Sequence, residues 1–260
     1  MRRMVVLASA VAVVASAAAW VRRSRGVVST GGPGVMPGRI GSWINGYMDR
    51  PLHAAVARLL ALQPDDDLLD VACGAGYFLT ETASQVGHVT GIDLSGPKVE
   101  LARRRLGARI AAGTAEVVEG DAGSLPWADG RFTAVACMDA FPFFPDPEGA
   151  LAEMRRVLRP GGRAVIDVNP RIPEGTESHA LRGVGGRFMA WNDADVRRMV
   201  EAAGFAEVEI SHLRGSDNGL FNAMSRRSFG TDEETIVAAV KPLPSPPADA
   251  ARAEEAGAVG

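Results

Sequence analysis

A change of pattern within residues 68–78, LLDVACGAGYF, constrains the fold of this chain more than any other feature. Residues 68–72 are apolar except for Asp70, which is typical of a buried parallel strand. Gly74 and Gly76 follow, and helical spacing resumes directly after them. A strand, a glycine turn and a helix start let backbone approach a ligand without interference from a Cβ atom. We therefore predict a nucleotide-like ligand over the two glycines.

Composition excludes several classes of protein. The 260 residues suffice for one large α/β domain or two small ones. A net charge of −3 and 23% charged residues give no basic excess that would indicate a nucleic-acid partner. Cys73 and Cys137 lie in apolar strand-like runs, so we expect buried thiols in a reducing compartment rather than a disulfide framework. The four histidines are scattered and no metal-binding spacing occurs, so we expect no metal site.

The amino-terminal residues 1–25 form a hydrophobic segment whose central part, residues 4–21, carries no charge. At a rise of 1.5 Å per residue it would span about 27 Å, roughly the hydrocarbon thickness of a bilayer. We interpret it as a membrane tether, and the arginines beyond it place the following domain in the cytoplasm. Alternatives are a cleaved signal peptide ending near residues 15–17, an organellar transit peptide, or a translation start at Met36 or Met48 that leaves a cytoplasmic protein.

A glycine-rich linker at residues 26–40 leads into alternating strand and helix patterns over residues 41–241. The predicted strands are residues 68–72, 88–93, 115–119, 132–138, 163–168, 206–213 and 235–241. The predicted helices lie before residue 64, at 78–86, from 97 onward, at 147–158, and at 192–203 with Asn192 as the cap. Residues 170–191 are predicted to be an irregular lid or insertion, and residues 242–260 a disordered tail.

This alternation predicts the fold class. Strand and helix patterns in turn indicate parallel βαβ units and an α/β fold with a seven-stranded, doubly wound, Rossmann-like sheet. The last two strands have no helix between them and should pair antiparallel. We therefore expect a mostly parallel sheet with an antiparallel last strand.

Three acids lie next to the ends of predicted strands: Asp70, Asp93 and Asp121. Ligands bind at the carboxyl ends of strands in a doubly wound sheet, where Asp93 could accept hydrogen bonds from both hydroxyls of a ribose. Asp121 could accept from an adenine amine. Each acid alone could also be a helix cap or a solvated turn residue. A dinucleotide site would need a third glycine where Leu79 stands, and an acid before Gly74 suits a positively charged ligand.

Four segments resemble, in order, motifs of the class I S-adenosylmethionine-dependent methyltransferases, in the small-molecule branch that includes quinone-biosynthesis enzymes. They are D-V-A-C-G-A-G at 70–76, G-I-D-L-S at 91–95, G-D-A-G-S-L-P-W at 120–127 and L-R-P-G-G-R at 158–163. Any one of these motifs is weak, but the ordered set is strong. The resemblance is close over residues 68–168 and looser up to residue 241. The chain departs from it at Ala72, where many members have glycine.

The resemblance implies S-adenosylmethionine as cofactor and direct in-line methyl transfer to a small-molecule acceptor. The cofactor-binding residues that it implies are Asp70, Ala72, Cys73, Gly74, Gly76, Asp93, Leu94, Asp121, Ala122 and Met138. In that set the two glycines would pass under the methionine part of the cofactor and Asp93 would hold its ribose hydroxyls. Leu94 would pack on the adenine, and Met138 would face the sulfonium.

The acceptor side is expected after the fourth strand, where many close relatives carry a histidine and this chain has none. Positioning can supply most of the acceleration of an in-line transfer, so no fixed base is obligatory. Asp139 is the nearest candidate for a catalytic base or an acceptor-orienting group. Phe141, Phe143 and Phe144 would either wall an apolar acceptor pocket or belong to the core. A quinone-like or lipid-like acceptor would suit both these rings and a membrane tether.

Two other functions compete with this interpretation. The missing histidine leaves open a catalytically inactive S-adenosylmethionine-binding regulatory module. The glycine turn alone also leaves open an NAD-dependent dehydrogenase, although the absent third glycine argues against it.

Overall fold

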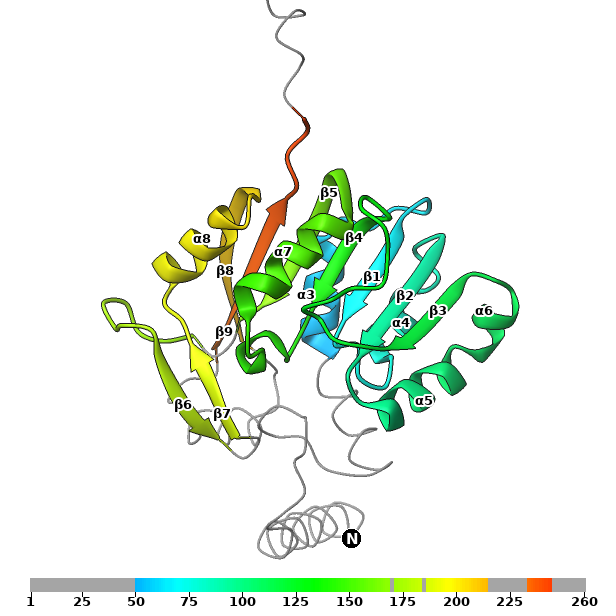
Figure 1. The fold of residues 1–260 in the computed structure, drawn as a ribbon, viewed down its shortest axis with the longest axis horizontal. Helices are drawn as coiled ribbons and strands as arrows, with labels where there is room; N and C mark the ends of the chain where they lie inside the picture. Colours follow the sequence, from blue (N-terminus) through cyan, green and yellow to red (C-terminus); the bar gives the residue numbers. More distant parts are fainter. Residues whose placement is uncertain (1–49, 169–170, 184–185, 215–232, 245–260) are drawn as a thin grey trace, which may run out of the picture.

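A seven-stranded sheet forms the centre of the computed structural model, which describes residues 50–168, 171–183, 186–214 and 233–244 (Figure 1). The strands lie in the order β3-β2-β1-β4-β5-β9-β8. They are β1 (Asp67–Val71), β2 (His88–Asp93), β3 (Ala115–Glu119), β4 (Phe132–Cys137), β5 (Leu158–Asp167), β8 (Ala206–Arg214) and β9 (Glu233–Val240). The first five are parallel, and β9 is antiparallel to both β5 and β8. The predicted sheet, mostly parallel with an antiparallel last strand, is confirmed.

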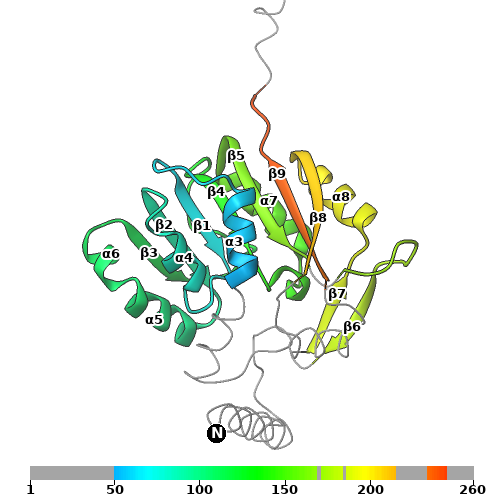
Figure 2. The ribbon, with the colours of Figure 1, turned by 180° about the vertical axis from the view of Figure 1, so that it is seen from behind.

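Helices cover both faces of this sheet (Figures 1 and 2). One face carries α3 (Arg50–Leu59), α4 (Tyr77–Thr82) and α5 (Gly96–Arg105), with the short α6 (Gly107–Ala111) following α5. The other face carries α7 (Pro147–Val157) and α8 (Asp193–Ala202). Leu60, Leu79 and Val99 belong to the core on the first face, and Leu151 and Val196 to the core on the second. The two cores make the fold doubly wound, as predicted.

Local sequence explains where the helices of the second face begin. Asp146 precedes α7, and its carboxylate accepts a hydrogen bond from the Gly149 amide at 2.9 Å. Asn192 precedes α8, and its side-chain oxygen accepts from the Asp195 amide at 2.8 Å, as predicted for a cap. Behind these caps the apolar positions recur at helical spacing, so each helix buries one side against the sheet.

The structure corrects the prediction for residues 170–191, which were expected to be irregular. This segment contains a two-stranded antiparallel hairpin, β6 (His179–Gly183) and β7 (Gly186–Ala190). The strands have five residues each and a glycine at each inner end, so they show too little alternation to be recognised. β5 also begins earlier than predicted, at Leu158. The register shifts beside Phe132, so that residues 159–162 bulge out within the strand.

The predicted tether at residues 4–21, the linker at residues 26–40 and most of the tail at residues 242–260 lie outside the described residues. Within the described ranges, no helix has the length and apolar character needed to cross a membrane.

Candidate functional site

The turn between β1 and α4 has a left-handed backbone at three positions. The φ angles are 62° at Ala72, 55° at Gly74 and 73° at Gly76. A Cβ atom at Gly76 would come within 2.9 Å of the Ala102 Cβ on α5, so glycine is required there for conformation and for space. The Cys73 amide donates to the main chain of β2 at 2.9 Å. Strain at Ala72, in a turn fixed from both sides, is a feature that clusters at functional sites.

Asp93, at the end of β2, holds this turn from the neighbouring strand. Its Oδ2 accepts a hydrogen bond from the Gly74 amide at 2.8 Å, and its Oδ1 accepts from the Ser95 amide at 2.9 Å. The side chain is nearly buried. A carboxylate has about four lone-pair positions, so each oxygen keeps the capacity to accept one further hydrogen bond. Asp93, which is predicted to bind the ribose hydroxyls, therefore also links the glycine turn to the start of α5.

Three carboxylates share one face of the sheet near its carboxyl edge. Asp70 lies in register with Gly91 of β2 and Ala136 of β4, two positions that offer little or no side chain. Asp93 lies two residues beyond Gly91, and Asp167 ends β5 on the same face, since side chains alternate along a strand. These carboxylates are 2%, 6% and 0% exposed. Asp167 was not predicted, although it ends its strand as Asp93 does.

Burial controls the ionisation of the groups beneath the turn. Burial raises the pKa of the Asp70 carboxyl well above its ordinary value, and the nearby Asp93 adds to this shift. Burial also raises the pKa of the Cys73 and Cys137 thiols well above their ordinary value. The thiols are therefore buried, as predicted, and stay protonated. Since a nearby cation favours the charged form of a carboxyl, the raised pKa of Asp70 suits a positively charged ligand.

The adenine-side candidates lie at the ends of β2 and β3. Leu94 is 63% exposed, which is unusual for a large apolar side chain directly after a buried strand. Asp121 is exposed, and its Oδ1 accepts from the Gly123 amide at 2.9 Å, while Ala122 is half-buried. The structure therefore leaves an apolar surface and a carboxylate accessible at neighbouring strand ends.

A pair of charged residues on α7 fixes the loop that follows Asp121. Arg156 donates to the carbonyl oxygens of Leu125 at 2.8 Å and Trp127 at 2.7 Å. Glu153 accepts from the Leu125 amide at 2.8 Å and pairs with Arg156 at 2.7 Å. The hydrogen bond from Arg156 lowers the pKa of Glu153, more than its partial burial raises it. Sequence reasoning missed this pair because its partners are mainly backbone atoms.

The predicted acceptor side lies where β4 and β5 end. Met138 is nearly buried, and Asp139 is exposed with a φ of 53°, an uncommon conformation for this residue. The Asp139 amide donates to Asp167 Oδ2 at 3.1 Å. The structure thus brings the candidate base beside the unpredicted acid of β5.

The three phenylalanines occupy different environments. Phe141 is fully buried, and its ring centroid lies 5.3 Å from that of Trp191 and 5.7 Å from that of Phe144, which fits the core alternative. Phe143 is half-buried and faces Phe188 of the β7 strand, with 5.5 Å between ring centroids. Phe144 is also half-buried but packs against the core with Phe141, whereas the hairpin supplies the partner of Phe143.

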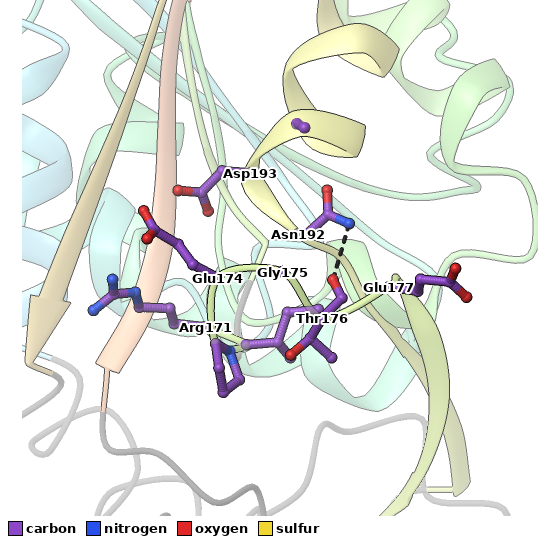
Figure 3. A pocket seen from close by; sticks show the side chains of 10 residues that line it. Arg171, Glu174, Gly175, Thr176, Glu177, Asn192 and Asp193 are labelled. Carbon is purple, nitrogen blue, oxygen red and sulfur yellow. Dashed lines mark hydrogen bonds between the residues drawn. The ribbon is translucent and has the colours of Figure 1, made fainter.

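A hollow of about 390 Å³ lies beyond the end of β5, between residues 171–177 and the start of α8 (Figure 3). The Asn192 side-chain amide donates to the Thr176 carbonyl at 3.1 Å across it. Arg171 and Asp193 bring opposite charges to its lining. The hollow includes none of the predicted site residues, and we do not assign it to the cofactor.

Comparison with known proteins gives one recurring activity. Residues 69–166 match the family model described as a methyltransferase domain. The chain is 45% identical over 117 residues to a demethylmenaquinone methyltransferase of Deinococcus radiodurans. The matched segment covers 44% of this chain and 47% of that enzyme. It is 32% identical to an O-methyltransferase of Aspergillus nomiae, over 67% of this chain and 83% of that protein. The chain thus spans about half of the first relative's length and most of the second's.

Solved structures agree with the fold. A putative methyltransferase of Bacillus halodurans superposes with a TM-score of 0.56 at 25% identity, over 74% of this chain and 99% of that one. A 1,6-didemethyltoxoflavin-N1-methyltransferase of Burkholderia thailandensis superposes with a TM-score of 0.60 at 19% identity, over 77% of this chain and 81% of that one. The second likeness bears on the fold alone.

Proposed function

Since the chain belongs to the class I S-adenosylmethionine-dependent methyltransferases, in the branch that includes quinone-biosynthesis enzymes, we propose that it methylates a small-molecule acceptor by direct in-line transfer. The observation that carries the proposal is the set of nearly buried carboxylates, Asp70, Asp93 and Asp167, on one face beside the glycine turn. Negative charge that is concentrated at low exposure is costly, and a cationic ligand relieves that cost.

The residues present fit this cofactor, which carries a sulfonium and an amino group. Asp70 lies nearly buried on the strand that leads into the turn, and Gly74 faces open space, since a Cβ atom added there would meet nothing within 4 Å. Asp93 would hold the ribose hydroxyls, and the exposed Leu94 would pack on the adenine with Asp121 at its edge. When bound, the cofactor supplies an activated methyl group, and the side chains of this chain orient it and the acceptor.

For the acceptor we infer an apolar, planar molecule, and a quinone-like ring is the class that the names of the relatives suggest. The half-buried Phe143 with Phe188 supports an apolar wall, since aromatic rings favour stacked or edge-on contacts with other rings. Asp139, exposed beside Asp167, would orient the acceptor or accept a proton that it loses.

Isothermal titration with S-adenosylhomocysteine and a labelled-methyl transfer assay with demethylmenaquinone test the proposal. We expect saturable binding by the wild type and transfer of label to the quinone-like acceptor. Absence of binding would remove the cofactor assignment. Binding with no product over a broad acceptor panel would favour the inactive regulatory module, and enhanced fluorescence of a reduced nicotinamide would favour a dehydrogenase.

We also propose that residues 4–21 tether the domain to a membrane, because the segment is uncharged and long enough to span a bilayer. The full chain should sediment with membranes, whereas a variant lacking residues 1–35 should remain in the supernatant with unchanged affinity for S-adenosylhomocysteine. Equal partitioning of the two would contradict the tether and leave the cofactor assignment intact.

A further inference from the structure

An arginine of α5 fixes the peptide that separates the two glycines of the turn. Arg105 Nη1 donates a hydrogen bond to the Ala75 carbonyl oxygen, and the Arg105 guanidinium lies 3.7 Å from the ring centroid of Tyr77. The Arg105 side chain therefore spans the junction at which the turn becomes α4, the helix beside α5 on this face of the sheet (Figure 2).

Holding that carbonyl also holds the amide on the other side of the same peptide. The Ala75 carbonyl and the Gly76 N–H belong to one planar unit. The Gly76 amide donates to the Cys73 carbonyl at 2.9 Å, so the unit is fixed by Arg105 at one end and by the turn itself at the other. Glycines on both sides make this segment costly to order, and an anchor between them reduces the entropy lost when a ligand binds.

A second arginine, four residues further on, holds the opposite end of the same helix. Arg109 donates to the carbonyl oxygen of Ala83, and to those of Val86 at 3.4 Å and Gly87 at 3.3 Å. The α4 helix has only six residues, and its cap residue, Gly76, provides no side-chain hydrogen bond. A helix this short is not stable alone, so both of its ends depend on outside partners.

We propose that Arg105 is a positioning residue for the cofactor: it presets the conformation of the glycine turn, whereas Arg109 serves only the stability of the fold. This inference rests on the proposed function. The two arginines share their residue type and the helix that they hold. Arg105 ends α5 and Arg109 lies on the following α6, and they differ in which end of α4 they hold. This difference makes them a matched pair.

The test compares Arg105→Met with Arg109→Met, using S-adenosylhomocysteine as the probe and Arg104→Met, an exposed change on the same helix, as the control. We expect Arg105→Met to raise the Kd about five- to tenfold, because a charged hydrogen bond and a stacked contact that preset the turn are lost. Arg109→Met should lower the midpoint of urea unfolding and leave the Kd within about twofold of wild type. The KM for the cofactor should rise in Arg105→Met with kcat retained.

Arg105→Lys separates position from charge. Lysine keeps the positive charge but lacks the planar fork, so it should recover less than half of the lost affinity; the same variant serves if Arg105→Met fails to fold. An unchanged Kd in Arg105→Met, or an equal rise in Arg109→Met, would overturn the inference while wild-type binding upholds the proposed function. A wild type that does not bind the probe would overturn both.

Discussion

Replacing Asp93 by asparagine separates its structural role from its proposed role in binding. The two Asp93 oxygens accept from the Gly74 amide at 2.8 Å and the Ser95 amide at 2.9 Å. Asparagine offers only one acceptor oxygen, so one of these amides loses its partner. An unsatisfied buried donor costs about 1–3 kcal/mol. Removing a charge beside Asp70 offsets part of that, so we expect the free energy of unfolding to fall by about 1–2 kcal/mol.

Binding should suffer more than stability in the same variant. If the carboxylate holds the ribose hydroxyls, at least one charge-assisted hydrogen bond worth about 1.5–3 kcal/mol is lost. Since 1.4 kcal/mol corresponds to about tenfold in affinity, the Kd for S-adenosylhomocysteine should rise at least about tenfold. Titration calorimetry gives the Kd, urea unfolding gives the stability, and Asp65→Asn, an exposed acid before β1, is the control. A Kd within about twofold of wild type, together with the stability loss, would refute the ribose role.

Three further outcomes follow from the same geometry. Asp70→Asn should raise the free energy of unfolding at pH 7, because above pH 3.8 the carboxyl ionises freely in the unfolded chain whereas burial opposes its ionisation in the fold. The gain should vanish below that pH in urea titrations, and binding of S-adenosylmethionine should weaken. Glu153→Gln should lower the free energy of unfolding at pH 7 by about 1–2 kcal/mol, because the bonds to Arg156 and the loop are weakened. Below the lowered pKa of Glu153 the variant and the wild type should be equally stable, which urea unfolding at two pH values would show. Phe143→Ala should remove a ring pair with Phe188 worth about 0.5–1.5 kcal/mol and raise the acceptor KM, with an unchanged cofactor Kd; a rise in the Kd instead would place the ring on the cofactor side.

The parallel part of the sheet was predictable because its central strands, β1, β2 and β4, are buried on both faces and are mostly apolar in sequence. Residues 132–138 show this well, since every position of β4 is buried. The hairpin of β6 and β7 was missed because its pairing is a property of the backbone, and its strands are too short for a pattern. The bulge in β5 hid its early start, because residues 158–163 contain a proline and two glycines, which do not indicate a strand.

In the candidate site, the acids near the ends of β1 and β2 were predictable, whereas Asp167 of β5 and the arginines that bind carbonyl groups were not. Asp70 and Asp93 were expected from their places next to strand ends, and Leu94 from the resemblance to the methyltransferases; their roles in cofactor binding stay predictions. Arg105 and Arg156 donate to main-chain oxygens, which every residue provides. The sequence therefore contains no particular residue type that would indicate these contacts. Predicting such contacts requires the distance between elements, which periodicity does not contain.

The order of the strands also affects how the chain can fold while it is being synthesised. The edge strand β8 pairs only with β9 among the described strands, and β9 lies between β8 and β5 although it comes last in the chain. A nascent chain can therefore assemble β1 to β5, with the glycine turn and all three carboxylates, while β8 has no neighbour. During translation, the cofactor half should become protected from proteolysis before the carboxyl-terminal strands, which wait for residues 233–240.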